Sequence, residues 1–301
     1  MKLKKIISVI LLVSFFSPAH SALNIFTCEP EWAALASQLG GEKVTVFSAT
    51  TGLQDPHHIQ ARPSLIAHIR NADLIICTGA DLEIGWLPLL LRRSSNSKIQ
   101  PGQLGNFVAT EYVRLLGKPK LIDRSQGDVH AAGNPHIQTN PKNILLVAKA
   151  LHKRLLQIDS QNSDHYNRLF NFFEQRWKKA LKHWKKMTKP LRHLEVVVHH
   201  DSWVYLRDYL KLKQVATLEQ KPGIPPTSGH LNQLLNTIRT NPVKVIFHAA
   251  YQPDKASIWL SNRTQIPAIV LPFTVGGTEQ ANDLFNLYED TFNRLLKAIQ
   301  L

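Results

Sequence analysis

Residues 164–187 read DHYNRLFNFFEQRWKKALKHWKKM and form the most clearly patterned stretch of the 301-residue chain. Apolar side chains recur there every three or four residues, which is typical of one face of an α-helix. They are Tyr166, Leu169, Phe170, Phe173, Trp177, Leu181, Trp184 and Met187. At about 1.5 Å per residue the helix would be long enough to run along two lobes. Lysine and arginine occupy its other face, which is more typical of a solvated surface than of a contact with anionic lipid.

Short apolar runs on both sides of this helix predict two groups of four buried strands. The first group is 23–28, 43–48, 73–78 and 119–122, and the second is 194–199, 214–218, 243–248 and 268–273. Helical patterns accompany them near residues 29–39, 63–70, 82–92, 202–211, 228–239 and 278–299. Alternation of strands and helices is typical of parallel sheets covered by helices. We therefore predict an α/β fold of two lobes, each a four-stranded, mainly parallel sheet flanked by helices, joined by the long helix.

The first residues have the pattern of a secretory signal peptide. Lysines at positions 2, 4 and 5 precede the apolar run 6–16, and the small-residue segment SPAHSA follows at 17–22. The run is too short to span a bilayer, which takes roughly 20 residues. We expect cleavage after Ser21, with Ala22 as the alternative, and export of a soluble protein to a bacterial periplasm. The predicted organisation is a signal peptide 1–21, an N-terminal lobe 22–158, a connecting helix segment 159–190 and a C-terminal lobe 191–301.

Composition excludes several classes of protein. A chain with 44% hydrophobic and 19% charged residues is not mostly disordered. The formal net charge of +14 invites a nucleic-acid partner, but export argues against one. Two cysteines, Cys28 and Cys77, are too few for a four-Cys zinc module. In an oxidising compartment they could pair or remain separate buried residues, and the sequence favours neither.

Histidines follow the predicted strands in both lobes. His57 follows the second strand, His136 the fourth, His200 the fifth, and His248 ends the seventh. Ligands bind beyond the carboxyl ends of strands in open α/β sheets, so these side chains are expected to converge in the cleft between the lobes. Three imidazole nitrogens suit Zn²⁺, whereas Ca²⁺ and Mg²⁺ prefer oxygen ligands. The sequence therefore predicts a zinc site.

These motifs resemble a known family, the cluster A-I (cluster 9) solute-binding proteins of bacterial ABC importers for zinc and manganese. The triplet DPH at 55–57 looks like the family's first-ligand motif, and NPH at 134–136 looks like its second. The segment HDSW at 200–203 resembles the segment that carries the third ligand. The resemblance covers essentially the whole mature chain and is nearest to the zinc-binding periplasmic members. It implies that the protein delivers Zn²⁺ to an ABC permease and its ATPase at the inner membrane.

The last cleft loop departs from the family pattern. Manganese-type members place an Asp after the eighth strand, whereas residues 273–278 here read FTVGGT, with Val275 at the expected position. A nitrogen-rich site without that acid implies zinc rather than manganese. A water molecule, an unidentified carboxylate or His248 could complete the metal sphere, and His248 could instead act behind the ligands. The histidine-rich loop of many zinc members is reduced here to the segment 128–130.

We predict a monomeric receptor that binds Zn²⁺ through His57, His136 and His200 and is not an enzyme. A secreted zinc hydrolase is the alternative from another class, because a three-His site with an open position can also be catalytic. The sequence has no HExxH motif, and no obvious Glu accompanies the three histidines to act as a base. A metal chaperone or adhesin on the same fold is a third possibility.

Overall fold

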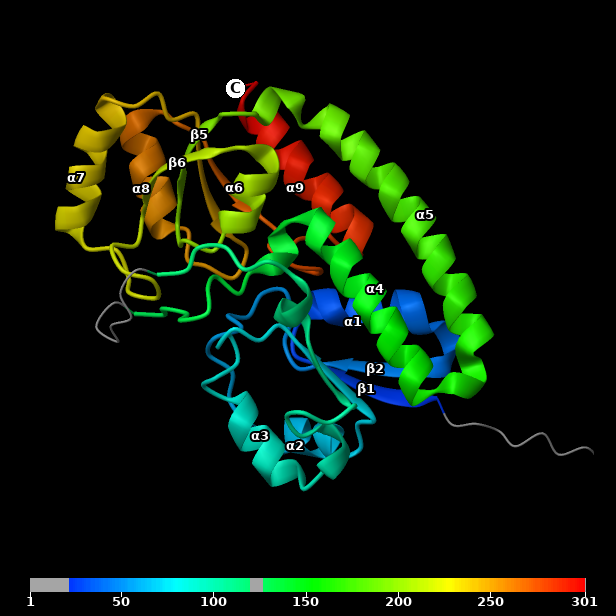
Figure 1. Ribbon diagram of the computed structural model, residues 1–301. Helices are drawn as coiled ribbons and strands as arrows, with labels where there is room; N and C mark the ends of the chain where they lie inside the picture. Colours follow the sequence, from blue (N-terminus) through cyan, green and yellow to red (C-terminus); the bar gives the residue numbers. More distant parts are fainter. Residues whose placement is uncertain (1–21, 120–126, 301) are drawn as a thin grey trace, which may run out of the picture.

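The structure, a computed structural model, describes residues 22–119 and 127–300. The predicted signal peptide, residues 1–21, lies outside the described part, and so do residues 120–122 of the predicted strand 119–122. The described residues form two α/β lobes, and a long helix, α5 (Ser163–Met187), runs along one side of both (Figure 1). The two-lobe α/β fold and the long connecting helix are therefore confirmed.

The first lobe is built on a parallel sheet in the order β2-β1-β3-β4. Its strands are β1 (Leu23–Thr27), β2 (Val44–Ser48), β3 (Leu74–Cys77) and β4 (Asn106–Val108). Its helices are α1 (Pro30–Gly40), α2 (Pro63–Arg70), α3 (Leu87–Ser94) and α4 (Pro141–Ile158). Alternate residues of β3 pack into two different hydrophobic clusters, so this strand is buried on both faces and reads as a continuous apolar run.

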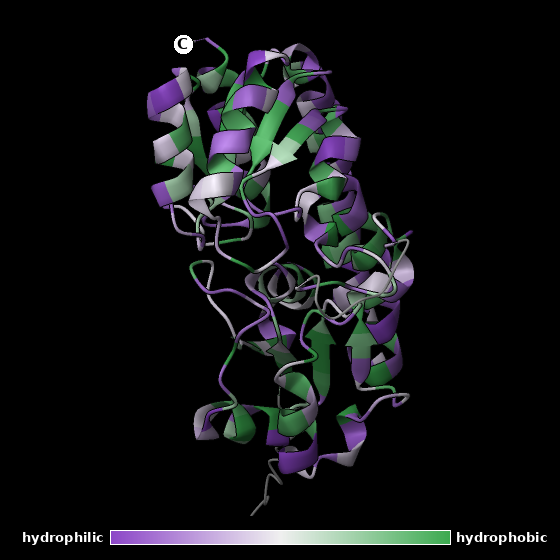
Figure 2. Cartoon of the chain, turned by 90° about the vertical axis from the view of Figure 1, so that its left-hand side faces the viewer, coloured by the Kyte–Doolittle hydropathy of each residue, from purple (hydrophilic) through white to green (hydrophobic). Residues whose placement is uncertain are grey.

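The second lobe repeats this topology with the order β6-β5-β7-β8, again all parallel. Its strands are β5 (Glu195–Val198), β6 (Lys213–Thr217), β7 (Val245–Ala249) and β8 (Ala268–Leu271). Its helices are α6 (Val204–Leu210), α7 (Ser228–Arg239), α8 (Lys255–Thr264) and α9 (Leu284–Ala298). Figure 2 shows the hydrophobic residues concentrated in the strands of both lobes. Among the described residues, no helix combines the length and the apolar character needed to cross a bilayer.

The fourth strand of the first sheet corrects the sequence analysis. The place beside β3 belongs to β4 at Asn106–Val108, which the sequence did not predict, whereas residues 120–122 lie outside the described part. A three-residue strand is too short to show a hydrophobic period, so only its pairing identifies it. The helices α4 and α8 were also not predicted from the sequence.

Two helices begin later than predicted. α3 begins at Leu87 rather than near residue 82, because residues 81–86 form turns and Trp86, the N-cap, has a non-helical φ of −139°. α9 begins after Asp283 rather than near residue 278. The Asp283 carboxylate caps the helix there by accepting a hydrogen bond from the backbone N–H of Asn286 at 2.8 Å.

α5 packs its apolar stripe against both lobes. Phe173, Trp177 and Trp184 are buried along it. They belong to one hydrophobic cluster that also contains Ile25 from the first sheet and Val245 from the second. The two lobes therefore share a continuous core along this helix.

The two cysteines form a disulfide bond. Cys28 directly follows β1 and Cys77 ends β3, so the bond joins the carboxyl ends of two neighbouring strands. Both residues are buried. Of the two alternatives that the sequence left open, the structure has the paired one.

Candidate metal centre

Four histidine side chains meet between the lobes at the carboxyl ends of the strands. His57 lies in the loop after β2, His136 precedes the 3₁₀ turn Ile137–Thr139, and His200 follows β5. The ring centroids of His57 and His136 are 5.3 Å apart, and that of His200 lies 6.1 Å from each. The fourth ring, His130, lies 5.3 Å from His57 and 6.2 Å from His136. The structure thus brings the three predicted ligands together and adds His130 to them.

Asp55 orients the imidazole of His57. Its Oδ1 atom lies 2.7 Å from His57 Nδ1 and also accepts a hydrogen bond from the His57 backbone N–H at 3.0 Å. This pairing assigns the ring proton to Nδ1, so Nε2, which faces His130 Nε2 at 3.2 Å, carries the lone pair that a metal ion would use. Burial raises the pKa of Asp55, but the hydrogen bonds from His57 outweigh burial and the net pKa is lowered. The carboxylate therefore stays charged beside the site.

Glu219 orients the imidazole of His200 in the second lobe in the same way. It follows β6, the neighbour of β5, and its Oε2 atom lies 2.7 Å from His200 Nδ1. Its other oxygen, Oε1, lies 3.4 Å from His199 Nε2, and Oε2 also accepts the backbone N–H of Gly223 at 2.9 Å. Burial raises the pKa of Glu219, yet the hydrogen bonds from His199 and His200 outweigh it and lower the pKa to about 2. His200 thus also presents Nε2 as its free nitrogen.

His136 is the most unusual side chain of the site. It is 0% exposed, and among the described residues neither of its ring nitrogens has a hydrogen-bond partner. Burial, followed by the charges of the neighbouring histidines, holds the pKa of His136 well below its usual range, so the ring is neutral. A buried polar atom without a partner costs roughly 1–3 kcal/mol. A metal ion bound to one of these nitrogens would offset that cost.

The loop that carries His136 is held by hydrogen bonds across the lobes. Asn134 Oδ1 accepts the His136 backbone N–H at 3.1 Å, and Asn134 Nδ2 donates to the carbonyl oxygen of Asp201 at 2.7 Å. Tyr205 Oη donates to the carbonyl oxygen of Asn134, also at 2.7 Å. Asp201 and Tyr205 belong to the segment that follows His200. The second and third predicted ligands are therefore positioned by one shared network.

His130 has the geometry of a metal ligand. Its Nε2 atom lies 3.2 Å from His57 Nε2. Two nitrogens bound to one tetrahedral Zn²⁺ at about 2.05 Å would be about 3.3 Å apart, which matches this separation. Nitrogens of His57, His130 and His136 all lie within 4.8 Å of one another. Burial, and then the charge of His57, lowers the pKa of His130 to about 4, so this ring is also neutral near pH 7.

Sequence reasoning missed His130 as a site residue. It lies between the predicted fourth strand and His136, in the segment 128–130 that the family resemblance presents as the remnant of a longer loop. The one available signal is its position six residues before His136, in the same connection. Sequence spacing alone cannot show that this connection folds back over His57.

His248 lies beside His199 on the second lobe. Its ring centroid is 6.5 Å from that of His199, and its Nδ1 atom is 3.1 Å from Ser257 Oγ. Burial, and then His199, lowers the pKa of His248. His199 in turn reaches His200 through the carboxylate of Glu219. The structure thus places His248 behind a carboxylate that orients a predicted ligand, and His130 at the position nearest to the other ligands.

His57 and His200 line a pocket of about 210 Å³ together with His58 and His199. Three carboxylates line it, from Asp55, Asp128 and Glu219. The Asp128 carboxylate lies 3.7 Å from His58 Nε2 at the mouth. The mouth therefore carries negative charge although the whole chain is basic, and this favours the entry of a cation.

Comparison with known proteins identifies the family. The family model described as "Zinc-uptake complex component A periplasmic" (ZnuA) matches residues 25–300. The chain belongs to this family. The resemblance to the cluster A-I metal receptors is thereby confirmed, and the chain is a member of the metal-binding substrate-binding proteins of ABC transporters.

Individual relatives include both zinc and manganese proteins. The high-affinity zinc uptake system protein ZnuA of Yersinia pestis is 26% identical over 195 residues, which cover 60% of this chain and 60% of that protein. The manganese ABC transporter substrate-binding lipoprotein PsaA of Streptococcus pneumoniae is 22% identical over 257 residues, or 84% of this chain and 80% of that protein. At these identities the relatives support the family and leave the choice of metal to the site itself.

Solved structures share the fold. A crystal structure of ZnuA superposes with a TM-score of 0.74 at 20% identity, covering 91% of this chain and 99% of that one. A manganese-bound periplasmic metal binding protein from Candidatus Liberibacter asiaticus gives a TM-score of 0.73 at 17% identity, covering 91% and 98%. Both likenesses confirm the arrangement of two lobes.

Proposed function

We propose that this protein is a periplasmic receptor that binds Zn²⁺ between its lobes and delivers it to an ABC permease for uptake. The observation that carries the proposal is the buried imidazole of His136, whose two nitrogens have no partner among the described residues, within a group of four histidines. His57, His136 and His200 are the proposed ligands, and His130 is proposed as the fourth. Binding and release of the ion are the whole proposed activity.

The donor set supports zinc over manganese. All four proposed ligands are imidazoles, and the two nearest carboxylates, Asp55 and Glu219, are engaged with the Nδ1 atoms of His57 and His200. Mn²⁺ prefers oxygen ligands and lies low in the affinity order for a given nitrogen site. Four nitrogens in tetrahedral geometry suit Zn²⁺.

The wider biology follows from the family. A periplasmic location after removal of residues 1–21, a permease and its ATPase as partners, and a monomeric state are parts of the same proposal. So is the division into lobes at residues 158–159 and 190–191, around a connecting segment that contains α5. Members of this family are extracytoplasmic binding proteins, which supports export.

A competition titration tests the proposal. The mature protein is titrated with Zn²⁺ and with Mn²⁺ against a chromophoric chelator. We expect one tight Zn²⁺ site and weaker Mn²⁺ binding.

The triple variant His57→Ala/His136→Ala/His200→Ala should weaken Zn²⁺ binding by at least about a hundredfold, because three ligands and their geometry are lost. His183→Ala, at an exposed histidine of α5, is the matched control and should bind Zn²⁺ like the parent protein. Tight Zn²⁺ binding by the triple variant would refute the site, and tighter Mn²⁺ binding by the parent would refute the choice of metal.

A further inference from the structure

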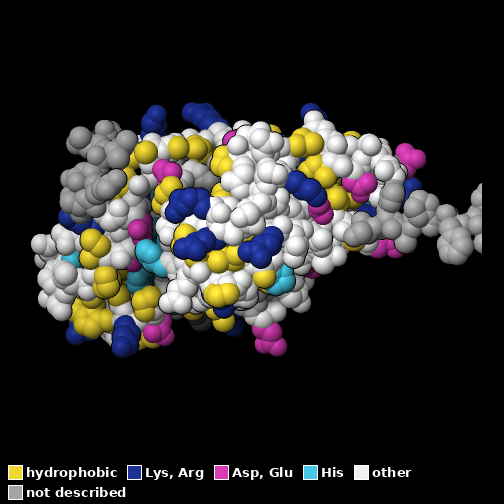
Figure 3. Space-filling view, turned by 90° about the horizontal axis from the view of Figure 1, so that it is seen from below, with side chains coloured by type: hydrophobic (Ala, Val, Ile, Leu, Met, Phe, Trp, Pro, Cys, Tyr) yellow, Lys and Arg dark blue, Asp and Glu magenta, His cyan; other side chains and the backbone are white. Residues whose placement is uncertain are grey.

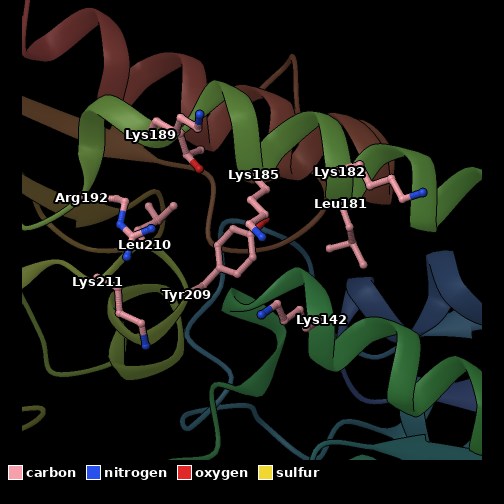
Figure 4. A pocket seen from close by; sticks show the side chains of 10 residues that line it. Lys142, Leu181, Lys182, Lys185, Lys189, Arg192, Tyr209, Leu210 and Lys211 are labelled. Atoms are coloured by element: carbon pink, nitrogen blue, oxygen red, sulfur yellow. The ribbon is translucent and has the colours of Figure 1, made fainter.

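A second pocket, which shares no lining residue with the pocket beside the histidines, is lined by cations. It encloses about 350 Å³, within the range of small-molecule sites, which is roughly 300–1,000 Å³. Six of its ten lining residues are basic and none is acidic; the basic ones are Lys142, Lys182, Lys185, Lys189, Arg192 and Lys211. We call it the basic pocket. Figure 4 shows its residues on α5, on the start of α4 and on the end of α6.

Few acidic side chains form ion pairs with these cations. Among the described residues, only Lys211 of the six forms an ion pair, with Asp208 at 2.9 Å on the exposed surface. The face seen from below in Figure 3 differs, because its basic side chains lie among acidic and hydrophobic ones. Clustered charges of one sign focus the electrostatic potential in a concave site and raise the local concentration of counter-ions. The basic pocket therefore favours an anion with several charges.

Tyr209 lies at the centre of the basic pocket. Figure 4 shows Lys142 and Lys185 reaching toward its ring from two sides, with Arg192 and Lys211 beyond it. Lys142 Nζ lies 5.8 Å from the ring centroid, within reach of a cation–π contact. Burial raises the pKa of Tyr209 to about 12, so the phenol stays neutral and adds no negative charge.

Helix stability does not explain Lys142. It is the second residue of α4, where a cation works against the helix dipole, which is positive at this end. The neighbouring N-cap, Asn140, already accepts the Lys142 backbone N–H at 2.9 Å. Lys185, by contrast, lies in the last turn of α5, where a cation stabilises the helix. Lys142 therefore works against the dipole of its own helix while it adds positive charge to the basic pocket.

We propose that the basic pocket binds a compact polyanion of the phosphate class, either a soluble di- or triphosphate or the phosphorylated headgroup of a lipid. Lysine and arginine are the side chains that bind phosphate oxygens through charge-assisted hydrogen bonds. The volume exceeds that of one phosphate, and the cations are spread around the lining, so several anionic groups can be held at once. Lys142 belongs to α4, Lys185 to α5, and Lys211 directly follows α6, so one bound anion would contact both lobes and the helix between them.

The test uses pyrophosphate as the soluble probe and anionic vesicles as the lipid probe. Metal-free mature protein is titrated with pyrophosphate by calorimetry at low salt, and cosedimented with phosphatidylglycerol vesicles against phosphatidylcholine vesicles. The pocket variant is Lys142→Gln/Lys185→Gln. The control, Lys153→Gln/Lys186→Gln, removes two exposed lysines from the same helices outside the pocket, with the same change in net charge.

We expect one site for pyrophosphate or selective sedimentation with the anionic vesicles, and the probe that binds identifies the source of the phosphate group. The pocket variant should weaken binding at least about tenfold because it loses two charge-assisted contacts, and the control by less than about twofold. Arg192→Gln/Lys211→Gln repeats the test from the other side of Tyr209 if the first variant has a lowered melting temperature. Equal losses in pocket and control variants, or no binding to either probe, would overturn the proposal.

Discussion

At the scale of single residues, the centre depends on carboxylates that hold imidazoles. Asp55 lies 2.7 Å from the Nδ1 atom of His57, and Glu219 lies at the same distance from that of His200. Each pairing turns the free Nε2 lone pair into the site and makes the ring more basic. His136 has no such partner among the described residues, and its orientation comes from its buried loop.

Alanine variants of His130 and His248 show which of the two histidines contributes more to Zn²⁺ affinity. His130→Ala should weaken Zn²⁺ binding by about tenfold or more, because its Nε2 atom lies 3.2 Å from that of His57. His248→Ala should change the affinity less, since His248 reaches the site only through His199 and Glu219. Chelator competition on both variants measures the difference. A larger loss in His248→Ala would assign the fourth position to His248 instead.

The buried histidines also predict how acid affects the metal-free protein. The pKa of His130 is lowered from 6.5 to about 4, and that of His136 lies well below 6.5, both because of burial. Below about pH 6.5 the unfolded chain therefore takes up protons that the folded chain does not, and stability falls as the pH drops from about 6.5 toward about 4. Denaturant unfolding at several pH values measures this loss. His130→Ala/His136→Ala should lose less stability over the same range, and parallel curves for the two proteins would contradict the prediction.

At the scale of elements, α5 is held by one aromatic cluster. The Trp177 ring centroid lies 5.4 Å from that of Trp184 and 4.8 Å from that of Phe285 on α9. Its indole N–H donates to the carbonyl oxygen of Pro141 at the start of α4, at 2.8 Å. Trp177 thus connects the long helix to one helix of each lobe.

Truncation of Trp177 should therefore be costly. Trp177→Ala is expected to lower the free energy of unfolding by about 3–5 kcal/mol, through lost burial and the cavity that remains. Phe172→Ala is the matched control, because Phe172 is an aromatic residue of the same helix but is 58% exposed. Its cost should stay below about 1 kcal/mol. Urea unfolding compares the two, and similar losses would show that the buried cluster does not stabilise the helix.

At the scale of the whole molecule, the lobes are joined by more than α5. The Thr274 hydroxyl of the second lobe donates to the buried carboxyl of Glu31 on α1. The loops around Gly52 and Gly277 approach so closely that a Cβ atom on Gly52 would lie 2.3 Å from Gly277 N, which only glycine permits. Together with the shared core, these contacts favour a stiff pair of lobes over a freely hinged one.

Because Glu31 can ionise, the stability of this contact between the lobes depends on pH. Burial raises its pKa from 4.5 to about 7, although the hydrogen bond from Thr274 opposes the rise. Between about pH 4.5 and pH 7 the folded chain holds a proton that the unfolded chain has lost, so this contribution to stability falls as the pH rises and is gone above about pH 7. Glu31→Gln keeps an acceptor for Thr274 but cannot ionise.

The free energy of unfolding of the Glu31→Gln variant should therefore rise relative to that of the parent protein as the pH rises. Between about pH 5 and about pH 8 we expect its relative free energy of unfolding to improve by on the order of 2 kcal/mol. Denaturant unfolding at both pH values measures the shift. Glu279→Gln, at an exposed carboxylate, should show no such trend. A constant difference between Glu31→Gln and the parent protein would contradict the prediction.

The sequence alone determined the local features of this protein. The period of the apolar residues from Tyr166 to Met187 predicted α5, and apolar runs predicted the four strands of the second lobe to within two residues. The motifs around His57, His136 and His200 identified the family. These features depend on residues close together in the chain, where period and spacing carry the information.

Tertiary structure decided whatever depends on distant segments. β4 exists because it pairs with β3, and the two sheets share one topology although no sequence repeat reveals it. His130 lies against His57, 73 residues away, because its connection folds back over that loop. The basic pocket exists only where α4, α5 and α6 meet. Short local segments carry no record of such contacts, because packing between elements creates them.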